Sequence, residues 1–503
     1  MKKLLLYIGV AASMLGLNAC SDSYLDNSPT DQTSSSVVPT SLNNIYLAVN
    51  GLQRSLVVQY GSQGQGGEPG FAMCRDFMGD DITWNAVASW HVGLLQWTAH
   101  RLPTSSYQLP WEVYYEWIMN ANMILEALEQ VNESDKGSEL YKQCKGEALC
   151  FRGYCHWILV QMYGERYDKN GQNSGPGVPY RLSSGTDDLA RSSVKECYDN
   201  IVKDLDEAVA NLKGITLKVN DYNHCSYAVA CGLRARVALT MQDYATAANY
   251  ADLAIQAAEA DGGKLMTVEQ AAKCPTEPIF PNITTETGEA MWAAMTQDDQ
   301  TVYFYSFYAY MSWNFSSTAI RTYGKSISST TYEAMSETDV RRSWFIPKTS
   351  DIKVPASNYK KFPYANHKFT ARATSNAVGD YAFMRLSEMY LMKAEAQARN
   401  NDAGAAATFT TFQVNRDPEY VAPASLDELL EDIMASRRVE LWGEGFRWLD
   451  LKRLNLPLDR TGKNFDIATC SVLQVPAGDV RWQWLLPQAE IDANQLLEQN
   501  PLN

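Results

Sequence analysis

Apolar residues recur at spacings of three and four along much of this 503-residue chain. The pattern is clear from Trp111 to Val131 and again from Leu426 to Leu451. This spacing places apolar side chains on one face of an α-helix, and that face must pack against other elements. We therefore predict a mainly α-helical fold, in which the 46% of hydrophobic residues supply a large core.

Long segments without this period separate the helical stretches. We expect the repeat helices within about 40–60, 107–163, 194–260 and 381–453, and inserted loops at 61–106, 164–192 and 274–377. Residues 454–503 form a C-terminal tail. Loops this long are usually functional or carry minor structure of their own. The prediction is one domain over 40–503 with minor β structure.

Two stretches share the same order of a helix, a short turn and a second helix. "ACGLRARVALTMQDYATAANYADLAIQ" has a short turn at Gln242–Asp243, and "MRLSEMYLMKAEAQARNNDAGAAATFTTFQVNR" has its turn at Asn400 to Asp402. Small residues follow each turn and allow two helices to approach closely. Both stretches resemble degenerate tetratricopeptide units. Generic helical hairpins are the alternative.

The N-terminus indicates secretion and lipid attachment. Lys2 and Lys3 precede an apolar run, Leu4–Leu17, that is too short to span a bilayer. Cys20 comes directly after Leu17-Asn18-Ala19 and precedes a polar stretch, so the segment resembles a bacterial lipobox. We predict a signal peptide at 1–19, lipidation of Cys20, and a lipidated flexible tether over 20–39. Plain secretion is the alternative.

Charge and cysteine usage exclude several classes of protein. The net charge of −15 repels phosphate backbones, so nucleic acid is not an expected partner. Nine cysteines remain after Cys20, an odd number with no C-x-x-C pair, which argues against a disulfide framework. The histidines show no spacing typical of metal ligands. We predict neither a cofactor nor a metal site, although the sequence leaves a structural metal ion open.

The C-terminal third carries a recognisable order of motifs. "YAFMRLSEMYLMKAEAQAR", "IMASRRVELWGEGFRWLDLKRLN" and "LLPQAEIDANQLLEQNPLN" follow one another. This order resembles the SusD/RagB family of Bacteroidetes surface lipoproteins. The resemblance implies a SusD-like helical fold, attachment to the outer membrane, nutrient binding without catalysis, and a SusC-like TonB-dependent β-barrel transporter as the partner. It also implies a ligand platform in loops inserted before and after the central helices.

Charged residues cluster near the end of the helical region, where they could form either a catalytic site or a structural network. Arg437, Glu440, Glu444 and Arg447 stand three or four positions apart, so on one helix their charges could pair along a single face. We predict that they form a structural ion-pair network.

Known catalytic templates do not fit the chain. The "GKS" at Gly324 lacks the earlier glycine of a phosphate-binding loop, and no H-E-x-x-H or G-x-S-x-G is present. Asp80 and Asp81 are adjacent, whereas a glycosidase needs two carboxylates facing each other across the sugar. We predict that the protein is not an enzyme. A surface glycoside hydrolase stays as the alternative.

Aromatic residues gather in two segments. The stretch from Tyr303 to Tyr323 contains nine in 21 positions, and "GDDITWNAVASWHVGLLQW" contains three tryptophans. Sugars have apolar C–H faces and polar rims, so a glycan site needs flat rings beside amides and carboxylates. The predicted ligand-binding residues are Asp81, Trp84, Asn85, Trp90, Tyr305, Tyr308, Tyr310, Trp313 and Asn314. A packing role, including a strand with one buried face over Tyr303, Tyr305 and Phe307, is the alternative.

Together these features predict a cell-surface protein that binds an oligosaccharide and delivers it to a transporter in the outer membrane. The sequence does not name the glycan. A tetratricopeptide scaffold that binds only protein is a further alternative, and it would have no affinity for glycans.

Overall fold

The computed structural model describes residues 41–61, 65–85, 89–217, 221–297 and 306–502. The predicted signal peptide, Cys20, the tether and Tyr305 lie outside these residues. The long helices are α2 (Leu42–Ser55), α5 (Leu109–Glu129), α6 (Glu139–Tyr163), α7 (Val194–Leu212), α8 (Tyr227–Thr240), α9 (Tyr244–Ala260), α15 (Leu386–Arg399), α16 (Ala405–Gln413), α17 (Leu426–Glu440) and α18 (Arg447–Arg453). The predicted mainly helical fold is confirmed.

Local sequence explains where several of these helices begin. Ser193 and Glu196 form a capping box at the start of α7, in which each side chain accepts a hydrogen bond from the other residue's backbone N–H. The turn between α8 and α9 places Gln242 at a φ of 60°, and the side chain of Asp243 then caps α9. The two predicted helical hairpins are therefore present, as α8–α9 and α15–α16.

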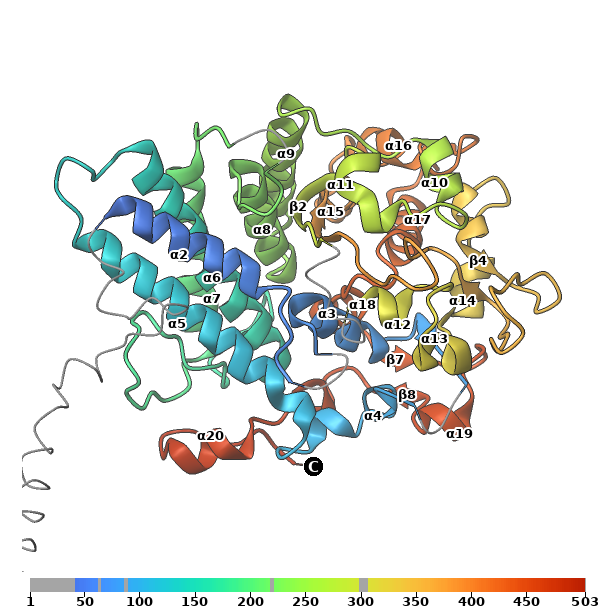
Figure 1. Cartoon of the computed structure of the whole chain (residues 1–503), viewed down its shortest axis with the longest axis horizontal. Helices are drawn as coiled ribbons and strands as arrows, with labels where there is room; N and C mark the ends of the chain where they lie inside the picture. The colour runs from blue at the N-terminus through green and yellow to red at the C-terminus, as the bar shows by residue number, and fades with distance from the viewer. Residues whose placement is uncertain (1–40, 62–64, 86–88, 218–220, 298–305, 503) are drawn as a thin grey trace, which may run out of the picture.

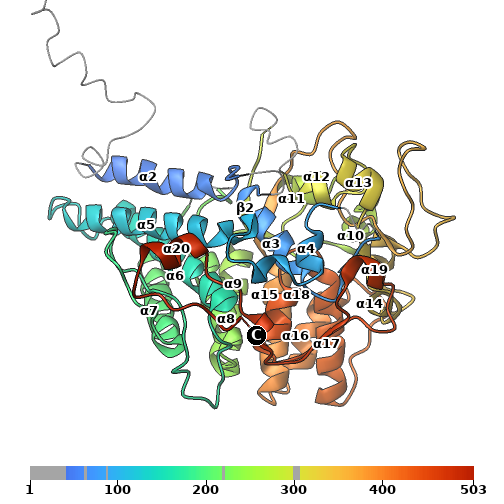
Figure 2. The same ribbon diagram turned by 90° about the horizontal axis from the view of Figure 1, so that it is seen from below.

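The helices form two groups of different direction. Figure 2 shows α2 and α5 at the upper left, while α7, α9, α15, α16 and α17 follow one another from left to right in the lower part of the view. Contacts between α8 and α9, α9 and α15, α15 and α16, and α15 and α17 join this second group into one layer. Small residues line the α8–α9 and α9–α15 contacts and let the helices approach, as the repeat pattern requires.

Short elements fill the inserted segments and the tail, mostly in the yellow and red half of Figure 1. The short helices are α3 (Gly67–Phe77), α4 (Val92–Leu95), α10 (Val268–Lys273), α11 (Ile283–Glu286), α12 (Tyr308–Met311), α13 (Thr318–Tyr323), α14 (Ser329–Glu333), α19 (Ile467–Cys470) and α20 (Gln488–Ala493). Single 3₁₀ turns are η3 (Ala99–Arg101), η4 (Ser106–Gln108), η5 (Phe280–Asn282), η7 (Val340–Trp344) and η8 (Val480–Trp482).

Three small antiparallel sheets complete the fold. The strands are β1 (Ile82–Thr83), β2 (Ala290–Ala294), β3 (Ser326–Ile327), β4 (Phe345–Ile346), β5 (Ala365–Asn366), β6 (Tyr381–Arg385), β7 (Leu458–Asp459) and β8 (Gln474–Val475). One sheet has the order β1-β3-β5-β4, and β2 pairs with β6 and β7 with β8. The predicted minor β structure is therefore found in and beside the inserted segments.

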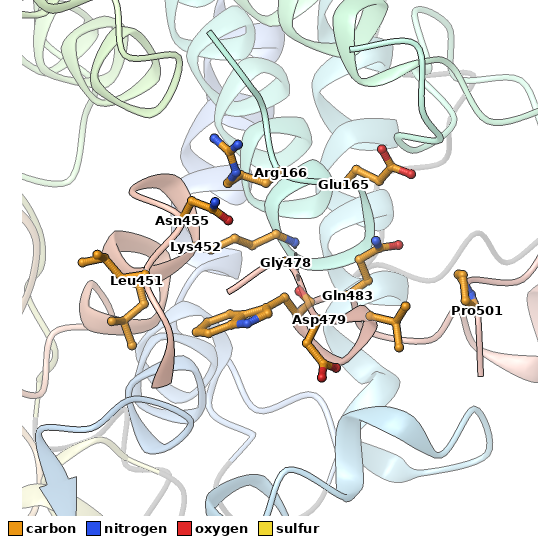
Figure 3. A pocket seen from close by; sticks show the side chains of 12 residues that line it. Glu165, Arg166, Leu451, Lys452, Asn455, Gly478, Asp479, Gln483 and Pro501 are labelled. Atoms are coloured by element: carbon orange, nitrogen blue, oxygen red, sulfur yellow. Dashed lines mark hydrogen bonds between the residues drawn. The ribbon is translucent and has the colours of Figure 1, made fainter. Parts of the chain in front are cut away.

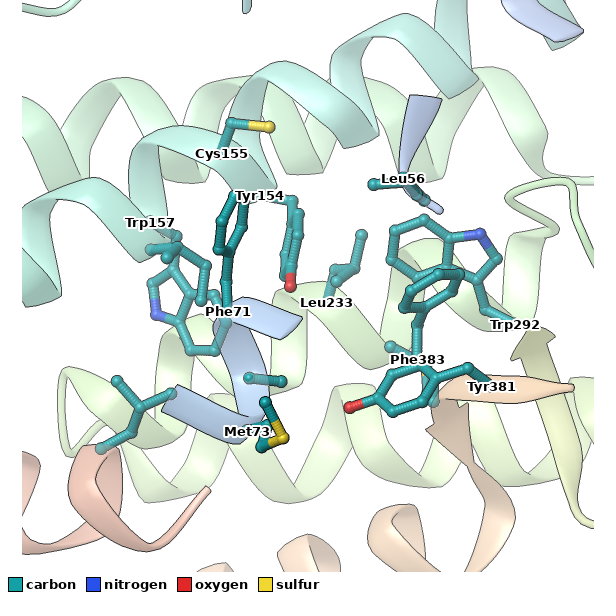
Figure 4. Close-up of a cluster of buried hydrophobic side chains, with 14 of the residues drawn as sticks. Leu56, Phe71, Met73, Tyr154, Cys155, Trp157, Leu233, Trp292, Tyr381 and Phe383 are labelled. Atoms are coloured by element: carbon teal, nitrogen blue, oxygen red, sulfur yellow. The ribbon is translucent and has the colours of Figure 1, made fainter. Parts of the chain in front are cut away.

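The core joins the helices to the β2–β6 pair. Trp292 of β2 lies 5.7 Å from the ring of Tyr154 on α6 and 4.9 Å from Phe383 on β6, measured between ring centroids. Figure 4 shows Trp292, Phe383 and Tyr381 together. The nine cysteines of the described residues are free and buried, in agreement with the argument against a disulfide framework, and they pack as small apolar side chains. No helix in the described ranges combines the length and apolarity needed to cross a bilayer.

Two secondary-structure expectations were wrong. The segment 61–106 contains the helix α3, all eleven residues of which are buried, and Gly67, Pro69 and Gly70 at its start are residues typical of turns. The helical stretch expected from Tyr381 begins instead as strand β6, because its first residues pair with β2.

The predicted ion-pair network of Arg437, Glu440, Glu444 and Arg447 has other partners than the sequence analysis expected. Helix α17 ends at Glu440, and Gly443 and Gly445 follow with positive φ, so the charges do not share one helix. Glu440 instead contacts arginines from three other segments, and Arg447 binds Asp80. The network is structural, as predicted, but tertiary contacts build it.

Candidate functional site

The structure brings the two aromatic segments together. Strand β1 pairs with β3, which places Ile82 opposite Ile327 and Thr83 opposite Ser326. The ring of His91 lies 5.2 Å from that of Tyr310. Segments that are more than 200 residues apart in the sequence therefore pack against each other near α4, α12 and α13, and we call the surface above this contact the aromatic face.

Among the described residues of this face, Trp90 carries an exposed ring. Of the 13 tryptophans, eleven are buried and Trp313 is part-buried, whereas Trp90 has 43% of its surface exposed. Asn85, on the same segment, is also exposed. An exposed indole with an amide nearby in the chain is the combination that a sugar ring needs for stacking and hydrogen bonding.

Trp84 lies in the core and presents no ring face to solvent. Its surface is 1% exposed, its ring packs against Phe77 at 4.9 Å, and its Nε1 donates to Ser89 Oγ at 2.6 Å. Lys325 Nζ lies 4.5 Å from the centre of the ring. The contacts of Trp84 fix the segment that carries Trp90. Its buried ring leaves no face on which a sugar could stack.

Asp81 is likewise occupied by structural contacts. Its carboxylate accepts hydrogen bonds from Arg438 at 2.5 Å and from Thr331 Oγ1 at 2.6 Å, and it is 2% exposed. The neighbouring Asp80 is bound by Arg447 and Lys463. Both carboxylates thus fix loops to the end of α17 and the residues that follow it.

The second segment is also largely buried. Tyr308 donates to the carbonyl of Asp380, and Tyr310 packs against His91; each is 3% exposed. Asn314 is bound on both sides of its amide by the backbone of Ala371. These contacts assign the three side chains to packing.

Trp313 keeps part of its surface accessible. Its ring lies parallel to that of His367, with 4.3 Å between centroids and 6° between planes. Its Nε1 donates to Thr370 Oγ1 at 2.9 Å, which fixes the ring in place. Trp313 therefore stays a candidate ligand contact together with Trp90 and Asn85.

Lys325 is a residue of this site that the sequence analysis missed. Its Nζ is surrounded by the rings of Phe77, Trp84 and Tyr323, at 5.5, 4.5 and 5.1 Å, and donates to the carbonyl of Tyr323. Burial lowers the pKa of Lys325 to about 7. The lysine links the two aromatic segments by packing against these rings and, in its protonated form, by cation–π contacts. No local pattern indicated it, because its partners come from three separate elements.

The acidic pair does not form a hydrolytic site. Burial alone would raise the pKa of Asp80, but Arg447 and Arg438 hold it well below its usual range. A glycosidase acid needs a raised pKa and space for a sugar. The hollow beside Asp76 and Asp81 has a volume of about 10 Å³, which holds at most one water.

A larger cavity of about 380 Å³ lies away from the aromatic face, between the end of α6 and the tail. Figure 3 shows Lys452 extending toward Gln483 across its centre. Lys452 Nζ donates to three backbone carbonyls, those of Gln161, Gly164 and Trp482. Burial lowers the pKa of this lysine to about 7. All three of its N–H donors are satisfied, so Lys452 ties three segments together.

The family of the chain follows from comparison with known proteins. A family described as "Starch-binding associating with outer membrane" matches residues 23–239, and the SusD family matches residues 281–502. Together the two matches span most of the chain. The protein belongs to the SusD/RagB family. Among curated proteins, none is significantly similar to it.

Solved structures share the fold at low sequence identity. A SusD superfamily protein from Bacteroides thetaiotaomicron VPI-5482 is 22% identical with a TM-score of 0.76, and the match covers 92% of this chain and 100% of that one. A SusD-like carbohydrate binding protein from Bacteroides vulgatus ATCC 8482 is 21% identical with a TM-score of 0.75, over 91% and 97% of the two chains. A laminarin binding SusD-like protein is 18% identical with a TM-score of 0.69, over 91% and 99%.

Proposed function

We propose that this protein binds an oligosaccharide at the cell surface and delivers it to a TonB-dependent transporter in the outer membrane. The observation that carries the proposal is the convergence of the two aromatic segments on one face, with Trp90 exposed at its surface. The SusD-like structures described as binding carbohydrate or laminarin support the same class of ligand. Lipid attachment through Cys20 would hold the protein at the membrane.

The binding chemistry depends on Trp90, Asn85 and Trp313. An indole stacks on the C–H face of a pyranose, while the amide of Asn85 can bond to hydroxyl groups. The buried cluster under this face, with Lys325 among three rings, keeps the aromatic segments in place before the ligand arrives. Preorganisation of this kind lowers the entropic cost of binding.

A calorimetric glycan screen tests the proposal. The protein for the screen is the mature chain from residue 20 with Cys20→Ala, which lacks only the proposed anchor. For the glycan that binds, we expect Trp90→Ala to weaken the affinity roughly two- to twelvefold, from about 0.5–1.5 kcal/mol of stacking. Leu47→Ala, an exposed apolar position on α2, serves as the matched control and should not change it. If Trp90→Ala leaves the affinity unchanged, the glycan does not bind at this face.

The same preparation separates the alternatives. A glycoside hydrolase would release reducing sugar from the bound glycan, and a protein-binding scaffold would bind no glycan at all. For delivery, gentle extraction of the tagged full-length protein from its host, followed by mass spectrometry, should recover one large β-barrel protein in near-equal amount. Its reproducible absence would indicate a free-standing binder.

A further inference from the structure

A groove of about 390 Å³ lies between the first half of α5, the loop at 179–186 and the tail around α20. It does not share a lining residue with the aromatic face. Its volume is in the range of sites that bind small molecules or single side chains. The groove therefore does not depend on the proposed glycan site, and neither does the inference below.

The floor of the groove is an apolar stripe on α5. Trp111, Tyr115 and Met119 line it at intervals of four residues, so they occupy one face of the helix. The rings of Trp111 and Tyr115 are 4.9 Å apart, and Tyr115 donates to the carbonyl of Pro179 at 2.8 Å. Trp111 is 2% exposed, whereas Met119 is 37% exposed and forms the accessible apolar end of the stripe.

Carboxylates line the edge of the same groove. Glu112 and Glu116 follow Trp111 and Tyr115 on α5, and Glu490 faces them from α20. In the part of the chain that the structure describes, no hydrogen bond or ion pair engages any of these three carboxylates. Burial raises the pKa of Glu112, with Glu490 adding to the effect, and burial also raises that of Glu116. The three carboxylates therefore lie at this edge of the groove without an ion-pair partner in the described ranges.

The one cation in the lining is held by the backbone. Arg181 Nη1 donates to the carbonyl of Gly185 at 3.0 Å, and Nη2 donates to that of Asp187 at 3.0 Å. Two of the nitrogens of Arg181 are therefore engaged by backbone carbonyls of its own loop. Three carboxylates thus face one guanidinium, and the groove keeps an excess of negative charge.

The loop that walls the groove is preformed. Asn122 Nδ2 donates to the carbonyls of Arg181 and Ser183, at 3.2 and 3.0 Å. The carboxylate of Glu126 accepts from Ser184 N at 2.7 Å and from Ser184 Oγ at 2.6 Å. Both anchors come from α5 itself, so the floor and the wall keep a fixed relation.

We propose that this groove binds a segment of a partner protein in which a lysine or arginine stands next to an apolar side chain. The carboxylates complement the cation, and the Trp111–Met119 stripe receives the apolar neighbour together with the methylene stem of the basic residue. The chain's own tether does not fit, because residues 21–40 contain three aspartates and no lysine or arginine.

Calorimetric titration with a short peptide tests this inference. The probe is acetyl-GSKLWKSG-amide, and acetyl-GSELWESG-amide is its acidic counterpart. The protein is again the mature chain with Cys20→Ala, at low ionic strength. We expect saturable binding of the basic peptide, no binding of the acidic one, and an affinity about fivefold lower in the Glu112→Gln/Glu116→Gln double variant.

A matched control separates the groove from the overall negative charge. Glu337→Gln/Glu419→Gln removes two exposed carboxylates elsewhere and should leave the affinity unchanged. Met119→Ser should also weaken binding, which a purely ionic attraction would not show. Equal weakening in both double variants, no effect of Met119→Ser, or no saturable binding of the basic peptide would each overturn the proposal. Thermal unfolding of each variant checks that the fold is retained.

Discussion

Replacing Glu440 by glutamine tests the buried ion-pair network at its centre. Glu440 Oε1 accepts from Arg385 at 2.9 Å, and Oε2 accepts from Arg416 at 2.9 Å. Arg341 adds a third contact, 3.3 Å from Oε2. All four side chains are buried. Glu440→Gln keeps the shape but removes the charge and one acceptor, so a guanidinium faces an amide N–H.

The expected loss is large because Glu440 has no exposed surface. Removing one partner of a buried ion pair costs about 3–5 kcal/mol, since it leaves an uncompensated charge. The assay is equilibrium urea unfolding of the mature chain with Cys20→Ala, followed by tryptophan fluorescence. Glu419→Gln, the same change at an exposed position, should lie within about 0.5 kcal/mol of the parent. A loss below about 1 kcal/mol for Glu440→Gln would refute the argument.

The pH dependence gives an independent check on the same residue. Burial alone would raise the pKa of Glu440, but Arg416 and Arg385 hold it well below its usual range. A glutamate in the unfolded chain has a pKa of about 4.3. The stabilisation is therefore complete above about pH 5 and is lost as the pH falls through the unfolded value toward the folded one. The difference between the parent and Glu440→Gln should narrow below about pH 4.

Two further predictions concern the anchor and the backbone. In the full-length protein, Cys20→Ala should move the protein from the membrane to the soluble fraction; continued sedimentation with membranes would exclude lipidation as the anchor. Gly67→Ala should cost more than about 2 kcal/mol in urea unfolding, because Gly67 has a φ of 65° and an added Cβ would lie 2.0 Å from the carbonyl oxygen of Leu56. Gly51→Ala, where a Cβ meets nothing within 4 Å, should instead stabilise α2 by about 0.5–1 kcal/mol.

The sequence by itself determined the long helices. The apolar period of α5 and the turn at Gln242–Asp243 depend only on residues a few positions apart, and the structure confirms the α5 helix and the α8–α9 hairpin. Helix α3 escaped this reasoning because it is short and begins with Gly67, Pro69 and Gly70, which are typical of turns.

Only the tertiary structure decided which side chains are available to a ligand. Trp84 and Trp90 stand in the same polar-aromatic segment and look equivalent in the sequence, yet Trp84 is 1% exposed and Trp90 43%. The difference arises from Lys325 and Phe77, which come from other segments and enclose the Trp84 ring. Local spacing reports on contacts within one element, whereas the burial of a loop side chain depends on what the rest of the chain packs against it.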